Sequence, residues 1–270
     1  MLRKSSLLAL VVLVASTAAA QATAHDDHDD DHHHEHLHFS HPLVTESPSP
    51  DTKLRVDYLW ARSGAGIDRT IDHSVRVEGE YGFSSALSLA VTVPYVWRSD
   101  ALANVHGFDD TELSLKAASL RWGEQGVLVG GGLSAGLPTG NDARGIGSSR
   151  AIGLEPFVDV GVMRGKLQLV GFAQYGTTVR NPVGVDAERE LTFNGSALYP
   201  LGRLAELLVE YETSRVNEAG SAVTSRLVAP GIKVYPFANR QLMAGISVPV
   251  GVPTDAASAR GVLVSAFYHF

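Results

Sequence analysis

Apolar and polar residues alternate with period two along most of the sequence, in runs of about ten residues. In the run at 86–97, for example, Leu89 and Val91 lie on one face of an extended chain, and Thr92 lies on the other. Period two is the spacing of a β-strand with two different faces, whereas a helix repeats every 3.6 residues. No stretch of the sequence sustains the helical period, so the pattern predicts an all-β fold.

Twelve such runs follow one another, and the gaps between them alternate between long and short. PTGNDARGIGSSR is one of the long gaps, and WGEQ is one of the short ones. An even number of strands with long loops at one end and tight turns at the other is typical of outer-membrane barrels. We therefore predict a transmembrane, antiparallel, up-and-down β-barrel of about 12 strands. The expected strands lie near 53–62, 73–83, 86–97, 109–121, 126–137, 152–163, 166–176, 188–199, 203–215, 222–236, 241–251 and 260–270.

Aromatic residues separate this fold from a soluble β-sandwich or a lipocalin-like barrel, which would also show alternation. Every tyrosine and tryptophan falls near an end of a predicted strand, as the two aromatic girdles of a membrane barrel require. Two of them fit only if strands are irregular: Trp122 needs a β-bulge near Ala118, and Tyr235 needs one near Pro230. The outer girdle is predicted to hold Tyr58, Trp60, Tyr95, Trp97, Tyr175 and Tyr211, and the inner girdle Tyr81, Trp122, Tyr199, Tyr235 and Tyr268.

Because the girdle aromatics share the apolar face of the strands, the charged face is expected to line the lumen. Ten acids then face five bases, which leaves two interpretations. The charges form a structural salt-bridge network that fills a narrow barrel, or they line a passage that favours cations. The predicted lumen residues are Arg55, Asp57, Arg76, Glu78, Glu80, Glu112, Lys116, Glu155, Asp159, Glu190, Glu206, Glu210, Glu212, Arg226 and Lys233.

The first residues have the layout of a secretory signal peptide. Two basic residues precede an apolar run that is too short to span a bilayer, and a small-residue cleavage site follows. Ala22-Thr23-Ala24 fits the cleavage pattern best, with Ala18-Ala19-Ala20 as the alternative. We expect 1–24 to be removed and the chain to be exported. Residues 25–52 then form a disordered His/Asp-rich tail with a Pro/Ser linker, and 53–270 form the barrel.

The segment HDDHDDDHHHEHLHFSH at 25–41 holds eight of the 11 histidines, six acids and no lysine or arginine. Imidazole and carboxylate groups are common ligands of transition metals, whereas thiolate sites are excluded because the chain has no cysteine. The alternative is a solubilising extension without affinity for metal. With its linker, the segment is long enough to reach across the barrel mouth or to fold into it. We expect zinc, copper, nickel or cobalt to bind through a fluctuating set of ligands drawn from His25, His28, His32, His33, His34, His36, His38 and His41.

Short motifs resemble a known family. The last strand ends in FYHF with a terminal aromatic residue, which resembles outer-membrane barrels delivered by the barrel-assembly machinery. GLPTGND at the outer end of the fifth predicted strand and GVPTD at the end of the eleventh are similar to the transporter family labelled "MetA-pathway of phenol degradation", whose barrels are distantly like FadL-type channels. HFSHPLVTESPSPDTKLRVDY at 38–58 resembles the entry segment of a branch of such proteins with a histidine-rich N-terminus. The resemblance implies a porin-like barrel of a Gram-negative outer membrane, inserted by the barrel-assembly machinery and surrounded by outer-membrane lipids.

An enzyme is not expected. Outer-membrane phospholipases place a catalytic serine and histidine on the lipid-facing surface, but here His73 and His106 are expected in outer loops, His269 is expected to face the lumen, and no histidine remains on the lipid-facing side of a predicted strand. Nothing in the charge pattern suggests nucleic-acid binding, and no cofactor is expected in the barrel. Three functions remain. The first is a channel or transporter for a small solute, such as a transition-metal ion or chelate, with a periplasmic metal-binding arm. The second is a non-transporting barrel that serves as a metal sensor or anchors a periplasmic partner. The third is a FadL-like passage for apolar or aromatic solutes.

Overall fold

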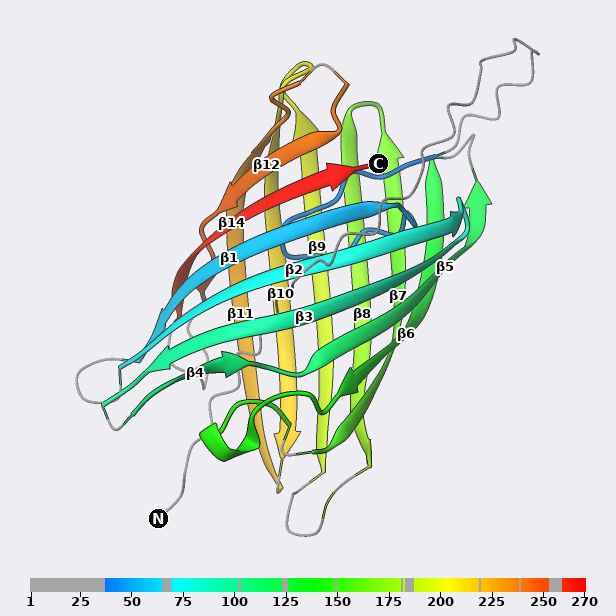
Figure 1. Ribbon diagram of the computed structural model, residues 1–270. Coiled ribbons are helices and arrows are strands. Elements are labelled where there is room, and N and C mark those ends of the chain that lie inside the picture. Colours follow the sequence, from blue (N-terminus) through cyan, green and yellow to red (C-terminus); the bar gives the residue numbers. More distant parts are fainter. Residues whose placement is uncertain are drawn as a thin grey trace.

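The computed structural model describes residues 37–64, 69–101, 103–122, 126–148, 150–180, 182, 187–218, 220–237, 239–252 and 259–270. Their strands form one antiparallel sheet that curls around into a barrel (Figure 1). The strands are β1 (Lys53–Ser63), β2 (Thr70–Ser84), β3 (Leu87–Ser99), β4 (Asn104–Phe108), β5 (Thr111–Trp122), β6 (Val127–Leu137), β7 (Ile152–Arg164), β8 (Leu167–Arg180), β9 (Glu188–Pro200), β10 (Ala205–Glu218), β11 (Ser221–Val234), β12 (Leu242–Ser247), β13 (Val250–Gly251) and β14 (Arg260–His269).

Pairing between the first and last strands closes the barrel. β1 pairs with β2 on one side and with β14 on the other. β4 and β5 both pair with β3, and β12 and β13 both pair with β11 and β14. The 14 strands therefore occupy twelve positions around the barrel. The prediction of a closed antiparallel barrel of about 12 strands is confirmed.

The two ends of the barrel carry different connections. At one end, the turn end, two residues join β2 to β3 and two join β7 to β8. At the other, the loop end, the connection from β6 to β7 is long and contains the short 3-10 helix η3 (Asp142–Arg144). Among the described residues, no helix has the length and apolar character to cross a membrane.

Two connections at the loop end are more strand-like than predicted. The gap expected before residue 109 contains β4, which continues the pairing with β3 as far as Asn104. β10 and β11 likewise continue until only two residues separate them. In both hairpins the backbone groups stay paired with the neighbouring strand, so the strands extend beyond the stretch in which the alternation is evident.

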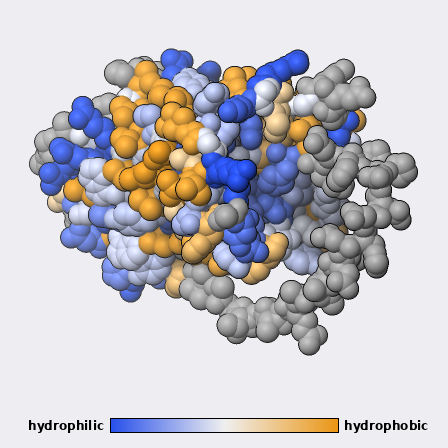
Figure 2. Space-filling view, turned by 90° about the horizontal axis from the view of Figure 1, so that it is seen from above, coloured by the Kyte–Doolittle hydropathy of each residue, from blue (hydrophilic) through white to orange (hydrophobic). Residues whose placement is uncertain are grey.

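The outward face of the barrel is apolar, and hydrophobic residues gather in patches on its surface (Figure 2). Tyrosines predicted for both girdles are exposed there, among them Tyr58 and Tyr211 toward the loop end and Tyr199 and Tyr268 toward the turn end. Tyr235 is the exception, because it is buried and its hydroxyl group contacts Glu206. Its assignment to the inner girdle is wrong.

The two predicted bulges have different outcomes. The pairing of β5 with β6 shifts between Ala118 and Leu120, so the bulge near Ala118 is confirmed. The pairing of β10 with β11 runs from Ala205 opposite Val234 to the loop end without a shift, so the bulge near Pro230 is wrong. Without that bulge Tyr235 stays on the same face as Lys233, which explains why it points into the barrel.

Candidate functional site: a plugged barrel interior

The segment that precedes β1 lies inside the barrel. Residues 37–52 form no helix or strand, yet most of them are buried, and Phe39, Leu43 and Ser47 are fully enclosed. The interpretation of the proline-rich part of this segment as a linker outside the folded structure is therefore wrong, although β1 begins at Lys53 as expected. We call residues 37–52 the plug. Its prolines are compatible with a buried position because proline has no backbone N–H group, and several other N–H groups of the plug donate to side chains of the wall, namely Gln168, Glu210 and Glu80.

Two wall glycines make room for the largest apolar side chains of the plug. A Cβ atom added at Gly161 in β7 would lie 2.6 Å from ring carbons of Phe39. A Cβ atom added at Gly245 in β12 would lie 2.7 Å from a methyl carbon of Leu43. Any side chain at either position would collide with the plug, so these glycines serve as sockets.

Glu210 in β10 holds the middle of the plug. Its carboxylate accepts hydrogen bonds from the backbone N–H groups of Leu43 (3.1 Å), Val44 (2.9 and 3.0 Å) and Thr45 (2.9 Å). The hydroxyl group of Ser196 donates a further hydrogen bond at 3.0 Å. Successive backbone donors directed at one carboxylate compensate for the loss of water around a fully buried charge.

Basic residues of the wall contact both the plug and neighbouring acids. Arg55 donates hydrogen bonds to the backbone carbonyl of Leu43 and to Asp57. Lys233 donates to the carbonyl of His41 (2.9 Å) and pairs with Glu206, and Tyr235 contacts the same carboxylate. These contacts attach the plug to β1, β10 and β11. Two further buried lysines complete the network: Lys53 pairs with Glu78 and Glu80, and Lys116 pairs with Glu46 of the plug.

The predicted lumen residues fall into three groups. The assignment of Arg226 to the lumen is wrong, because its side chain is exposed on the outward face, opposite Thr213. The expected bulge near Pro230, which would have turned it inward, is absent. Nine of the others are buried in the interior: Arg55, Asp57, Glu78, Glu80, Lys116, Asp159, Glu206, Glu210 and Lys233. Five are partly exposed: Arg76, Glu112, Glu155, Glu190 and Glu212.

Four of the partly exposed residues are acids, and they lie beyond the plug toward the loop end. Glu155 and Glu190 approach each other, since side-chain atoms of both lie within 3.6 Å of a Cβ atom added at Gly176. Glu190 also accepts a hydrogen bond from Ser214. Within the part of the chain that the structure describes, no lysine or arginine forms an ion pair with any of these four acids. We call Glu112, Glu155, Glu190 and Glu212 the loop-end carboxylates.

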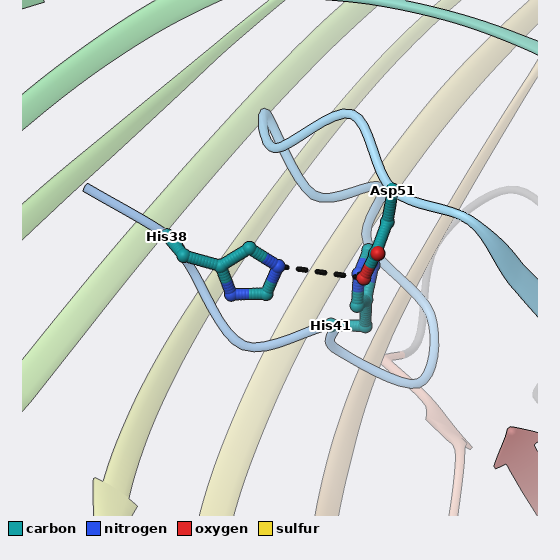
Figure 3. A group of neighbouring side chains, drawn as sticks. All are labelled: His38, His41 and Asp51. Carbon is teal, nitrogen blue, oxygen red and sulfur yellow. Dashed lines mark hydrogen bonds and ion pairs between the residues drawn. The ribbon is translucent and has the colours of Figure 1, made fainter. Parts of the chain in front are cut away.

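Three histidine rings lie near one carboxylate at the turn end, and Figure 3 shows two of them, His38 and His41, beside Asp51. Oδ2 of Asp51 lies 3.4 Å from Nε2 of His38, 3.1 Å from Nε2 of His41 and 2.7 Å from Nδ1 of His269. Burial and the nearby ammonium group of Lys53 lower the pKa of His41 to about 3. The imidazole of His41 is therefore neutral at neutral pH, which is the form that binds metal ions.

The structure places only part of the predicted metal-binding segment. His38 and His41 come together with Asp51, whereas His25, His28, His32, His33, His34 and His36 lie outside the described residues. Sequence reasoning missed Asp51 because it stands in the proline-rich stretch that was interpreted as a linker. It also missed Lys53, although Lys53 shares the alternation of Arg55 and Asp57 and could have been assigned to the lumen on that basis.

The two histidines expected in outer loops lie in strands. His73 belongs to β2 and His106 to β4, and each contacts a tyrosine hydroxyl group of a neighbouring strand. The distances are 2.8 Å from Nδ1 of His73 to Tyr58 and 3.0 Å from Nδ1 of His106 to Tyr95. The premise that histidine is absent from the outward-facing strand positions is wrong, because strands β2 to β4 extend farther than the alternation indicates. Among the described residues, neither histidine is hydrogen-bonded to a serine.

No protein-family model and no curated protein matches the sequence. Solved structures with a similar fold include an outer membrane channel from Pseudomonas putida F1, with a TM-score of 0.61, 14% identity, and coverage of 81% of this chain and 95% of that one. The NanC porin has a TM-score of 0.54 at 10% identity over 80% of this chain and 100% of that one. The β domain of the Bordetella autotransporter BrkA has a TM-score of 0.54 at 10% identity over 82% and 100%. At these identities the likeness shows a fold shared with bacterial outer-membrane barrels.

Proposed function

We propose that the chain is an outer-membrane channel or transporter for a small cationic solute, with a transition-metal ion or its chelate as the first candidate. The observation that carries this proposal is the group of loop-end carboxylates on the inner wall. Acids that are partly exposed and have no basic partner among the described residues attract cations and repel anions. The motifs GLPTGND and GVPTD, which resemble the transporter family named above, agree with a role in passage.

The plug sets the condition for passage. It fills the turn-end half of a narrow barrel, so a solute crosses only after the plug moves. The plug continues directly into β1, so it can leave the lumen while it stays attached to the wall. In this proposal both chain ends face the periplasm, and the histidine-rich residues before the plug raise the local concentration of metal ions there.

Reversal potentials in planar bilayers test the proposal. Under a salt gradient we expect the full exported chain to open intermittently and to prefer cations. A variant in which all four loop-end carboxylates are replaced by glutamine should lose most of this preference. The matched control is the double variant Asp72→Asn with Arg98→Gln, which removes both members of an ion pair between neighbouring strands, keeps the net charge and should leave selectivity unchanged. Equal selectivity in all three proteins would contradict a cation-selective passage.

The buried network around the plug favours a second candidate, a non-transporting barrel that acts as a metal sensor or as an anchor for a periplasmic partner. Backbone and side-chain groups along the plug, from Ser40 to Asp51, bond to the wall, as expected if the barrel is permanently closed. The combined variant Glu210→Gln and Lys233→Met loosens these contacts at two points. Conductance that appears in this variant supports a channel, and a folded variant that stays silent supports the closed barrel.

A further inference from the structure

The two ends of the plug meet at the mouth of the barrel. His38 and His41 lie near its beginning and Asp51 near its end, and their ligand atoms all lie within 4.8 Å of one another. Metal–nitrogen and metal–oxygen bonds of about 2.0–2.2 Å in a tetrahedral site place neighbouring ligand atoms about 3.3–3.6 Å apart. The distances of 3.4 and 3.1 Å from the two imidazoles to Asp51 therefore need little adjustment to admit an ion.

We propose that His38, His41 and Asp51 bind one divalent transition-metal ion, and that this ion closes the plug into a loop and retains it in the barrel. Two imidazoles and a carboxylate suit zinc, cobalt or nickel, and a water molecule completes the tetrahedron. An ion can enter from solvent, because the side chain of His38 is 52% exposed. His41 is buried, so the site joins a solvent-facing ligand to one that is fixed by packing.

His269 connects this site to the barrel wall. It lies in β14, and its Nδ1 atom is 2.7 Å from Oδ2 of Asp51. A second group that bonds to a metal-binding carboxylate orients that ligand and raises the affinity of the site. The ring of His41 also packs beside the rings of His269 and Phe267, with centroids 5.4 and 6.1 Å away. Through these contacts the metal-closed loop is held against the last strand.

The consequence is a plug whose retention depends on metal. The ion links residues at both ends of the plug, so it lowers the number of conformations that the released plug can adopt and favours the docked state. The effect on passage rests on the proposed channel function. Ion binding and retention of the plug can be measured whether or not the barrel conducts, so failure of one idea is distinguishable from failure of the other.

Cobalt spectroscopy tests the site. The full exported chain is used with His25, His28, His32, His33, His34 and His36 replaced by asparagine, which removes the other histidines of the segment. We expect one Co²⁺ per chain, a visible absorption band of tetrahedral intensity, and displacement by Zn²⁺. Adding His38→Asn or Asp51→Asn should abolish the band, and His106→Asn is the control that should preserve it. His38→Asn changes a half-exposed side chain, so the barrel should still fold, and its heat-modifiable migration on gels verifies this.

Hydrogen exchange tests the retention of the plug. With Zn²⁺ at 100 times its dissociation constant, amides of residues 39–50 that exchange by release of the plug should exchange more slowly, by at most about 100-fold, which is the limit for an ion that the released plug does not bind. His269→Phe should weaken Co²⁺ binding about 10- to 100-fold in the same background. A missing stoichiometric band, a band that survives Asp51→Asn, or plug exchange that is insensitive to Zn²⁺ would each overturn the proposal.

Discussion

The inner wall is charged along its whole length, but its two halves treat charge differently. In the turn-end half, buried lysines and arginines pair with acids and with carbonyl groups of the plug. In the loop-end half, the loop-end carboxylates remain partly exposed and have no basic partner among the described residues. A chain segment fills the first half, so charges there lose water and need partners, whereas the second half keeps water. The same alternating sequence pattern thus produces charges that hold the plug in the turn-end half and partly exposed carboxylates in the loop-end half.

The largest effect is expected from Lys53→Met in the turn-end half. This change leaves Glu78 and Glu80 buried without their shared cation. Loss of one partner from a buried ion pair typically costs about 3–5 kcal/mol. Urea unfolding of the protein in lipid vesicles, followed by tryptophan fluorescence, measures the difference. The control is Glu155→Gln in the loop-end half, which should shift the unfolding free energy by less than about 1 kcal/mol. Equal losses in both variants would show that the two halves are not distinct.

A smaller effect is expected from Glu210→Gln, for which the chain offers a matched control two residues away. Glu210 and Glu212 lie on the same face of β10, but only Glu210 contacts the plug. Hydrogen bonds to a charged group contribute about 1.5–3 kcal/mol. Glu210→Gln should therefore lower the free energy needed to release the plug by about that amount, so the plug opens more often. Amide exchange at residues 43–45 reports the release. Glu212→Gln should leave this exchange unchanged and alter ion selectivity instead.

Gly245→Ala should weaken docking of the plug by overpacking. The added methyl group collides with Leu43, and an extra methyl group in a packed interior costs about 1–3 kcal/mol. Protease protection of the plug in vesicles is the measurement. Combining Gly245→Ala with Leu43→Ala removes the collision, so the double variant should recover part of the lost protection. A double variant that loses as much as the two single changes together would show that the socket is not the cause.

Acid should give the smallest effect, because the side chain of Glu46 is 28% exposed and solvent weakens its ion pair with Lys116. Burial opposes ionisation of Glu46, but the ammonium groups of Lys116 and Lys53 outweigh it and lower the pKa of Glu46 to about 2. A carboxylate whose pKa is lowered in the docked state stabilises that state above pH 4.5 and loses this contribution as the pH falls toward 2. Plug protection should therefore decline over this window. The decline should be shallower in Glu46→Gln, and an identical pH profile would exclude a contribution from this pair.

The wall of the barrel could be predicted from the sequence because a strand imposes a period of two on its side chains. The positions of Glu78, Glu80 and Glu210 follow from that period alone. The length of the segment before β1 left it free to fold into the barrel, but its docked position could not be predicted, because residues 37–52 have no regular period and are rich in residues that usually mark exposed linkers. Their burial depends on partners distant in the sequence, such as Glu210 and Gly161. The grouping of Asp51 with His38 and His269 likewise arises only when the plug is docked.

The pairing of Lys53 with His269 has a consequence for the order in which the protein is made. The plug is synthesised before any strand, but its anchors Glu206, Glu210 and Lys233 come near the end of the chain. It therefore has no complete docking surface until β10 and β11 stand in the wall, and none of the His269 contact until the β1–β14 seam has closed. Contacts that join such distant parts of a chain form late. A docked plug therefore requires a closed barrel, and a barrel that stalls before closure leaves the plug undocked.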